Sequence, residues 1–405
     1  MKDFKSDFPI FRNNPGIVFF DNAASTQKPS YVIDGIKNFM ENDYANIHRG
    51  AYSLSERSES LYEKSKEKVK EFINASHASE INYTYNSTYA LNMVSLSLKR
   101  SGMLKRGDKV LLSIVEHHAN IVPWLILKEE IGIEIDYVKV DESFGLDLSD
   151  LKNKLTSDVK VVSLTYVSNV TGQIFDLKGA SEIIRGSGKD IMFIIDGSQA
   201  IPHFKIDVQD LDCDFLFFTG HKVMAETGIG VLYGKREILK ELIPAFGGGG
   251  AINWVKKDEF KASGLPHRFE PGTPNIIGAV SLLKALEYIE SIGGYEKIEE
   301  NENMLMNHFL EKYEKIRDKV KLIGSDKSLN RVGVFTFAAD GIHPTDIADI
   351  LAENDICVRA GHHCAEPFMD HCDLKTTLRA SIYLYNTKED IDRFFEVFER
   401  ILNEI

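Results

Sequence analysis

Short apolar stretches alternate with longer helical patterns along the chain from about Asp108 onward. The short stretches are rich in β-branched and aromatic residues, and such alternation is typical of a sheet that helices cover on both faces. Several stretches are apolar throughout, as expected for strands buried on both faces of a largely parallel sheet. The predicted strands are Val110–Val115, Ile133–Val140, Val159–Val167, Met192–Ile195, Phe215–Thr219 and Val231–Tyr233.

Polar residues follow four of these strands directly. The four clusters are Glu116–Asn120, Ser168–Gly172, Asp196–Ala200 and Gly220–Lys222. In open α/β sheets, ligands bind beyond the carboxyl ends of the strands. We therefore predict that the four clusters line one pocket.

The C-terminal third has a different pattern, with long helices first and mixed elements afterwards. It predicts a smaller α+β unit, so we expect a large domain over residues 21–290 and a small domain made of residues 1–20 and 291–405. The predicted elements are helices over Asn275–Ile292, Tyr295–Val320 and Thr345–Asn354, a strand over Val332–Phe337, strands near Cys357 and Leu378, and a closing helix to Ile405. The glycine run Gly247–Gly250 suits a mobile active-site loop or a tight turn equally well.

Composition indicates a soluble globular protein, with 43% apolar and 27% charged residues in 405. A formal net charge of −13 argues against binding to nucleic acid or to anionic membranes. The apolar runs are too short to cross a bilayer, and the N-terminal residues do not resemble a secretory signal, so we expect a cytoplasmic protein. Free thiols in a reducing compartment are expected for the four cysteines, Cys213, Cys357, Cys364 and Cys372.

Lys222 and Asp196 are the first candidates for chemistry, because each ends or follows an apolar strand. An ammonium group in a partly desolvated pocket has a lowered pKa and can attack an aldehyde to form a Schiff base. A carboxylate such as that of Asp196 can keep a pyridinium nitrogen protonated. Each residue alone is compatible with a solvated strand end, but together with Thr219 and His221 they favour a cofactor site.

Further motifs extend this pattern over nearly the whole chain. They are FFDNAASTQKP (Phe19–Pro29), NIHRG (Asn46–Gly50), EHHANIVPW (Glu116–Trp124), SNVTG (Ser168–Gly172), DGSQA (Asp196–Ala200), GHK (Gly220–Lys222), FEPGTPN (Phe269–Asn275), VRAGHHCAEP (Val358–Pro367) and LRASIYLYNT (Leu378–Thr387). The sequence resembles the class V aminotransferase group of pyridoxal-phosphate enzymes and, within it, the SufS-type (group II) cysteine desulfurases. The resemblance implies fold type I, with a central, mostly parallel, seven-stranded sheet and a smaller α+β domain.

The resemblance also implies which residues hold pyridoxal 5'-phosphate. Lys222 would carry the cofactor and move the Cα proton, Asp196 would pair with the ring nitrogen, and His117 would stack on the ring. Contacts to the ring hydroxyl are implied for Gln199 and Asn169, and contacts to the phosphate for Ser87, Thr88, Thr219 and His221. Thr273 matches a residue that reaches the phosphate of the neighbouring subunit, which implies a homodimer.

The resemblance also implies which residues contact the substrate. Arg379 matches the clamp for the substrate carboxylate, for which a planar bidentate donor is suited. The other implied substrate contacts are Asn169, Arg359 and His48.

Cys364 matches the cysteine that accepts sulfur from L-cysteine as a persulfide. Its neighbours His362, His363, His371 and Cys372 could suggest zinc, but adjacent side chains point in different directions, so we expect no metal. A buried structural thiol is the simpler alternative, although the flanking glycine and proline suggest an exposed loop. The resemblance further implies a small sulfur-acceptor protein of the SufE or SufU type and a role in iron–sulfur cluster assembly.

Two departures from the family pattern lie beside the expected cofactor. The usual Gly-Thr-Thr-Glu is replaced by Asn86-Ser87-Thr88-Tyr89, and the usual aromatic-Gly-Pro by Met224-Ala225-Glu226. Two alternatives therefore stay open. One is a selenocysteine lyase or another class V lyase, and the other is a non-catalytic subunit that keeps only the fold.

Overall fold

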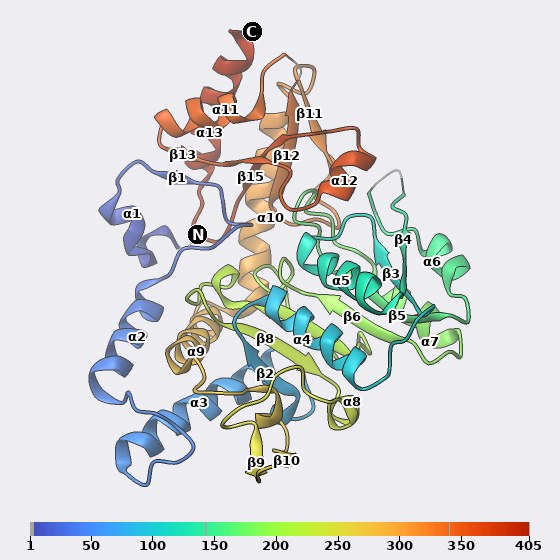
Figure 1. Cartoon of the computed structure of the whole chain (residues 1–405). Helices are drawn as coiled ribbons and strands as arrows, with labels where there is room; N and C mark the ends of the chain where they lie inside the picture. Colours follow the sequence, from blue (N-terminus) through green and yellow to red (C-terminus); the bar gives the residue numbers. More distant parts are fainter. Residues whose placement is uncertain (1–3, 142–143, 340, 405) are drawn as a thin grey trace.

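The computed structural model describes residues 4–141, 144–339 and 341–404 and shows a large sheet between helices with a smaller sheet beside it (Figure 1). The large sheet has seven strands, and β8 alone runs antiparallel to its neighbours. In sheet order the strands are β2 (Ile81–Thr84), β8 (Gly230–Gly234), β7 (Phe215–Thr219), β6 (Met192–Asp196), β5 (Val159–Thr165), β3 (Lys109–Ser113) and β4 (Glu134–Val138). The predicted mostly parallel, seven-stranded sheet is confirmed. The pattern missed β2, which is only four residues long.

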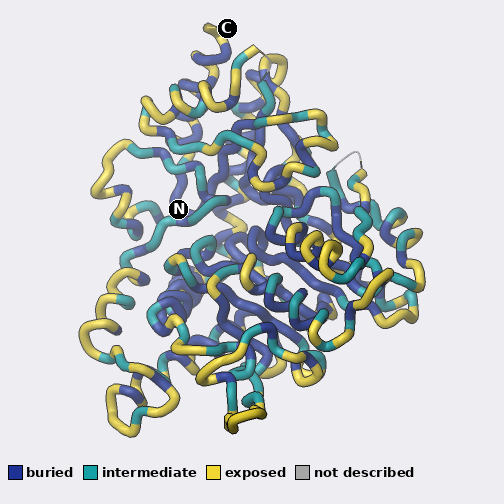
Figure 2. Tube along the Cα trace, in the orientation of Figure 1, coloured by how far each residue is buried: buried dark blue, intermediate teal, exposed yellow. Residues whose placement is uncertain are grey.

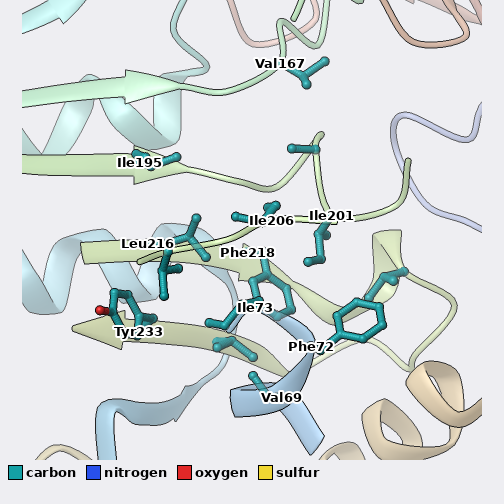
Figure 3. Close-up of a cluster of buried hydrophobic side chains, with 14 of the residues drawn as sticks. Val69, Phe72, Ile73, Val167, Ile195, Ile201, Ile206, Leu216, Phe218 and Tyr233 are labelled. Carbon is teal, nitrogen blue, oxygen red and sulfur yellow. The ribbon is translucent and has the colours of Figure 1, made fainter. Parts of the chain in front are cut away.

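Successive residues of the central strands point to opposite faces of the sheet, and both faces are covered. On β7, Phe215 and Phe217 belong to the apolar cluster formed with α4 (Ser87–Arg100) and α5 (Val122–Ile131). Leu216 and Phe218 belong to the other cluster, where they lie with residues of α3 (Ser53–Phe72) (Figure 3). Burial of each such side chain contributes about 1.5–3 kcal/mol. This explains why β7 is apolar from Phe215 to Phe218, and Figure 2 shows the central strands buried along their length.

The remaining helices and strands of the large part surround this sheet. They are α2 (Ser30–Asn42), α6 (Leu148–Lys154), α7 (Leu177–Gly186), α8 (Arg236–Glu241), α9 (Ile276–Ser291) and the hairpin of β9 (Ile252–Val255) and β10 (Phe260–Ala262). Among the described residues, no helix is long and apolar enough to span a membrane.

The smaller part is a four-stranded antiparallel sheet covered by helices. Its strand order is β11 (Val320–Ile323), β12 (Val334–Ala339), β15 (Thr377–Ser381) and β14 (Arg359–Gly361). The other elements of this part are α10 (Gly294–Tyr313), α11 (Pro344–Glu353), α12 (Glu366–His371), α13 (Lys388–Asn403), and the pair β1 (Val18–Phe19) and β13 (Ile356–Cys357). The predicted C-terminal end of the helix Tyr295–Val320 was wrong, because α10 ends at Tyr313. Ile316 and Val320 continue the helical spacing, but Val320 starts a strand paired with β12.

The N-terminal segment packs against both parts. The ring of Phe8, just before α1 (Pro9–Asn13), contacts Tyr288 and Tyr385 at centroid distances of 6.0 and 4.6 Å. Further along, Val18 and Phe20 join the apolar cluster of the small sheet. The division into residues 21–290 against 1–20 and 291–405 stays a prediction.

Candidate active site

A cavity of about 420 Å³ lies where the carboxyl ends of β5, β6 and β7 meet the small sheet. All four polar clusters that follow the strands contribute to its lining, so the sequence correctly predicted one shared pocket. The predicted site residues that line it are Ser87, Thr88, His117, Asn169, Asp196, Gln199, Thr219, His221, Lys222, Arg359, Cys364 and Arg379.

Lys222 lies in the short helix η4 (Gly220–Lys222), which follows β7 directly. Burial, together with the positive charges of Arg379 and Arg359, lowers the pKa of its amine to about 8, although the Asp196 carboxylate acts in the opposite direction. Asp196 ends β6 and is 5% exposed, and its Oδ1 accepts a hydrogen bond from the backbone N–H of Ser198 at 2.9 Å. A lysine whose pKa is lowered toward neutral pH, close to a buried carboxylate, is suited to act as a nucleophile.

The half-buried imidazole of His117 is neutral. Burial, together with the charge of Lys222, lowers its pKa to about 3. Its Nδ1 accepts a hydrogen bond from the backbone N–H of Ala119 at 3.0 Å, so the proton of the neutral ring is on Nε2. The ring is thereby held at one orientation on the cavity wall.

The N-terminus of α4 forms one end of the cavity. Ser87 is the first residue of α4, and its hydroxyl lies 2.7 Å from that of Ser198. Among the described residues, Thr219 Oγ1 is buried without a hydrogen-bond partner. Free backbone N–H groups at a helix start and spare hydroxyls favour a phosphate. Nearby, burial lowers the pKa of His221 to about 4, so this imidazole is a neutral hydrogen-bonding group.

Two arginines from neighbouring strands, Arg359 on β14 and Arg379 on β15, form the opposite wall and pair directly in the sheet. Asp21 binds both of them. Its carboxylate accepts two hydrogen bonds from Arg359, at 3.0 and 2.7 Å, and its Oδ1 lies 3.5 Å from Nη2 of Arg379. Arg379 also donates to the carbonyl of Asn169 at 3.0 Å, and burial lowers the pKa of its guanidinium to about 10. The more buried Arg379 is therefore fixed, with its Nε unpaired among the described residues.

Cys364 is exposed and lies on a loop that enters the cavity beside the arginines. His363 and Cys364 both have φ of 54°, a left-handed conformation that costs about 1–3 kcal/mol in residues other than glycine. Contacts to the large part hold this loop, because Asn169 Nδ2 donates to the carbonyl of His363 at 2.7 Å and the His118 N–H donates to that of Cys364 at 2.8 Å. The other three cysteines are buried or half-buried.

Thr273 and His48 do not line this cavity within the chain. Both are exposed and lie in the same region, because the rings of His48 and His267 are 5.1 Å apart and Thr273 follows His267 by six positions. The glycine run Gly247–Gly250 also lies outside the cavity and leads into the β9–β10 hairpin.

Sequence reasoning missed Asp21, Ser198 and Glu116. Glu116 precedes His117 in the sequence and is fully buried, and burial raises the pKa of its carboxyl to about 7. It accepts hydrogen bonds from Asn120 Nδ2 at 2.6 Å and from the N–H of Thr165 at 2.9 Å. Each of the three lies inside a motif, but only the fold shows its partners. A polar residue directly after the buried run ending at Phe20 was the available signal for Asp21.

Of the two departures from the family pattern, Asn86, Ser87 and Thr88 line the cavity, whereas Tyr89 and the segment Met224-Ala225-Glu226 lie outside the lining. Tyr89 stacks on Phe246 with a centroid distance of 5.3 Å. The carboxylate of Glu226 accepts a hydrogen bond from Nδ2 of Asn275 at 3.2 Å, and this asparagine caps the start of α9. Neither side chain obstructs the cavity.

The donor set fits pyridoxal phosphate. Lys222 offers a nucleophilic amine and Asp196 a carboxylate. The unpartnered hydroxyl of Thr219 and the start of α4 provide a cradle for a dianion. Lys222 follows β7, and β7 pairs with β8, the one reversed strand of the seven-stranded sheet. This arrangement is the fold of the pyridoxal-phosphate enzymes of fold type I.

The chain belongs to the class-V aminotransferase family, whose sequence model matches residues 18–394. It is 38% identical to a probable cysteine desulfurase of Synechocystis over 97% of this chain and 93% of that protein. The apo structure of a cysteine desulfurase from Thermococcus onnurineus superposes with a TM-score of 0.94, at 35% identity over 100% of this chain and 99% of that one. A cysteine desulfurase from Escherichia coli, solved in an S-sulfonic acid form, superposes with a TM-score of 0.90. It is 33% identical over 99% of this chain and 98% of that one.

Proposed function

We propose that this protein is a cysteine desulfurase that converts L-cysteine to L-alanine and keeps the sulfur as a persulfide on Cys364. One observation carries the proposal, which is that Cys364, Arg379 and Lys222 line the same cavity. A thiol that can be reached from solvent, a carboxylate clamp and a near-neutral amine are the three groups that this reaction needs. The relatives named above, similar over nearly their whole length, support the same activity.

Arg379 binds the substrate carboxylate in this scheme. Its position is set by the Asn169 carbonyl and by Asp21, so the guanidinium needs little reorganisation when a carboxylate arrives. Arg359 is held more tightly by Asp21, through two hydrogen bonds, and is more exposed. We assign it to the cavity wall beside the substrate.

Pyridoxal phosphate supplies an aldehyde for an amine and a ring that accepts electron density from the substrate Cα. Lys222 removes the Cα proton and serves as the local proton carrier, for which a pKa of about 8 is suited. Asp196 would keep the ring nitrogen protonated, and neutral His117 would pack on the ring. Ser87, Thr88, Thr219 and His221, all in the cavity lining, would hold the phosphate, and Gln199 and Asn169 would contact the ring hydroxyl.

Cys364 then attacks the substrate sulfur as a thiolate. The bond between Cβ and sulfur breaks, Cβ takes up a proton, and the sulfur stays on Cys364. The balance is L-cysteine plus a protein thiol giving L-alanine plus a protein persulfide, so no external oxidant or reductant is required.

The wider role follows the family. We assign the persulfide sulfur to a small acceptor protein of the SufE or SufU type and to iron–sulfur cluster assembly. The acting form is a homodimer in which Thr273 reaches the partner's phosphate, with His48 on the same surface. L-Selenocysteine is the second substrate to test.

Product analysis tests the proposal. Holoenzyme incubated with L-cysteine is expected to release alanine and to carry one sulfur per chain, detected by intact mass before and after a thiol reductant. Cys364→Ser should lose the bound sulfur and at least tenfold of alanine formation while keeping the visible absorbance of the bound cofactor. Cys372→Ser is the matched control. Undiminished alanine formation by Cys364→Ser would favour a lyase that does not use the thiol.

The non-catalytic alternative has a separate test. Tyr89 and Glu226 make contacts outside the cavity, so they do not block cofactor binding. Purified protein should therefore bind pyridoxal phosphate, and Lys222→Ala should lose the band of the lysine-bound cofactor. If the wild-type chain shows no such band, the result would favour the alternative of a non-catalytic subunit that keeps only the fold.

A further inference from the structure

Three side chains that can ligate a metal converge beside Cys364. His118, His362 and Glu366 each offer one nitrogen or oxygen atom, and these atoms all lie within 4.8 Å of one another. His118 lies in the short helix η3 (His118–Asn120) after β3, whereas His362 and Glu366 flank Cys364 on the small part. His118 and Glu366 are 248 positions apart in the sequence, so adjacency along the chain could not show the cluster.

The spacing of the atoms is close to that of a coordination shell. Nε2 of His118 lies 3.4 Å from Oε2 of Glu366. Two ligand atoms about 2.0–2.1 Å from a tetrahedral zinc ion are separated by about 3.3 Å. The rings of His118 and His362 are stacked at a centroid distance of 5.8 Å and an interplanar angle of 26°, and the ligand atom of His362 lies within 4.8 Å of the other two.

Both imidazoles already turn an unprotonated nitrogen toward a donor. Nε2 of His118 accepts the backbone N–H of Glu366 at 3.1 Å, and Nδ1 of His362 accepts that of Cys364 at 3.1 Å. Coordination requires such unprotonated nitrogens. A metal at Nε2 of His118 would take the place of the hydrogen bond from the Glu366 backbone.

The cluster is open to solvent. The side chain of His118 is 27% exposed and that of Glu366 is 61% exposed, so an ion can arrive from outside and keep a water ligand. Two imidazoles with one carboxylate suit zinc and its first-row neighbours better than magnesium or calcium, which prefer oxygen.

We propose that His118, His362 and Glu366 bind one divalent transition-metal ion of the zinc type, and that the bound ion fastens the Cys364 loop to the large part. The ion would join η3 to the loop and to α12, which lies on the side of the small part that faces α5 and β4 (Figure 1). The backbone bond from His118 to Cys364 runs through the same segment. Occupancy thereby restricts access to the thiol. The site depends on three side chains and not on the proposed desulfurase activity.

Direct binding of zinc chloride to holoenzyme, in competition with a chromogenic chelator, tests the site. One ion per chain is expected, with affinity at least tenfold weaker in Glu366→Gln and in His118→Asn. Cys364→Ser should bind zinc like the wild type, because the thiol is not among the three ligands. His308→Asn, which alters another surface histidine paired with a carboxylate at 2.8 Å, is the matched control.

Alkylation by iodoacetamide tests the effect on the loop without measuring turnover. Zinc should slow modification of Cys364 at least threefold in the wild type and leave the rate unchanged in Glu366→Gln. Wild-type zinc affinity in either ligand variant, or loss of binding in Cys364→Ser alone, overturns the proposal. Failure of the desulfurase assay leaves these readouts unaffected, so the two proposals fail separately.

Discussion

Lys222 has opposing neighbours that together set the state of its amine. Burial and the two arginines favour the neutral amine, whereas Asp196 and Cys364 favour the ammonium form. The resulting pKa of about 8 leaves a useful fraction of free amine near neutral pH. An ordinary lysine, with a pKa near 10.4, would be almost fully protonated there.

Attachment of pyridoxal phosphate to the apoprotein should therefore depend on pH with a midpoint near 8, because only the neutral amine attacks. The rate should rise with pH through this midpoint, followed by absorbance in stopped flow from about pH 6.5 to about pH 9.5. Arg379→Gln removes a positive charge that lowers the pKa of Lys222, so its midpoint should move to higher pH. Lys222→Ala is the blank. A flat profile, or a shift to lower pH in Arg379→Gln, would contradict this account.

At the scale of elements, the Ser168–Gly172 loop joins the two sheets. Gly172 has φ of +71°, and a Cβ built on it would lie 2.8 Å from the carbonyl oxygen of Val332 and 2.9 Å from that of Val334. Three positions earlier, the carbonyl of Asn169 accepts from Arg379. The position of Arg379, the proposed substrate clamp, thus depends on a close backbone approach that only glycine permits.

Gly172→Ala should lower the free energy of unfolding by about 1–3 kcal/mol, because the left-handed conformation is strained and the methyl group meets backbone atoms. It should also raise KM for L-cysteine, since the loop that holds Arg379 must shift. Urea unfolding and steady-state kinetics check both effects. Gly186→Ala at the end of α7, where an added Cβ meets nothing within 4 Å, should change stability by less than about 1 kcal/mol. Equal effects of the two substitutions would refute the steric argument.

A buried ion pair ties α3 to the segment before α9. Lys66 has a fully buried side chain, and its Nζ lies 2.8 Å from both carboxylate oxygens of Glu270. The hydroxyl of Tyr62 also donates to this carboxylate, at 3.0 Å. The pair therefore fixes the segment that continues to Thr273.

Lys66→Met should destabilise the protein by about 3–5 kcal/mol, because it leaves the Glu270 carboxylate buried without its cation. Lys64→Met, which breaks an exposed pair with Glu287, is the matched control and should cost no more than about 1 kcal/mol. Urea midpoints of the two variants give the comparison. If Lys66→Met/Glu270→Leu regains most of the lost stability, the unpaired charge is the cause, whereas no recovery would point to packing.

At the scale of the whole molecule, most of the candidate site lies within one chain, but Thr273 and His48 are exposed outside the cavity. The family's homodimer would place them at the partner's site. A single chain cannot show this, so the arrangement stays a prediction with its own experiment.

Mixed dimers test whether Thr273 serves the partner. A dimer of one Lys222→Ala chain and one Thr273→Val chain contains one site with both an intact Lys222 and an intact partner threonine. It should keep about half of the activity and the normal affinity for pyridoxal phosphate, whereas wild type paired with Lys222→Ala/Thr273→Val should lose cofactor affinity at its working site. Differentially tagged chains purified as mixed dimers supply the material. The reverse result, with loss of affinity only in the first mixed dimer, would place Thr273 in its own chain's site, and equal behaviour of the two would place it in neither site.

The sequence by itself determined the large sheet and the chemistry at its carboxyl edge. Strands buried on both faces tend to be apolar runs, so β7 was predicted with its observed bounds, and the residues after parallel strands meet at one edge of the sheet. Lys222 and Asp196 could be found for this reason. The short β2 and the end of α10 could not, because four residues carry no periodicity and Ile316 and Val320 fit a helix and a turn equally well.

Only the tertiary structure decided how distant segments meet. The contacts of Asp21 with two arginines, of Glu116 with Thr165, and of His118 with Glu366 each depend on parts of the chain that fold against one another. Local spacing describes which face a side chain occupies, but it carries no information on what packs against that face. For the same reason, the residues next to Cys364 in the sequence predicted no metal, while the folded chain brings His118 beside His362 and Glu366.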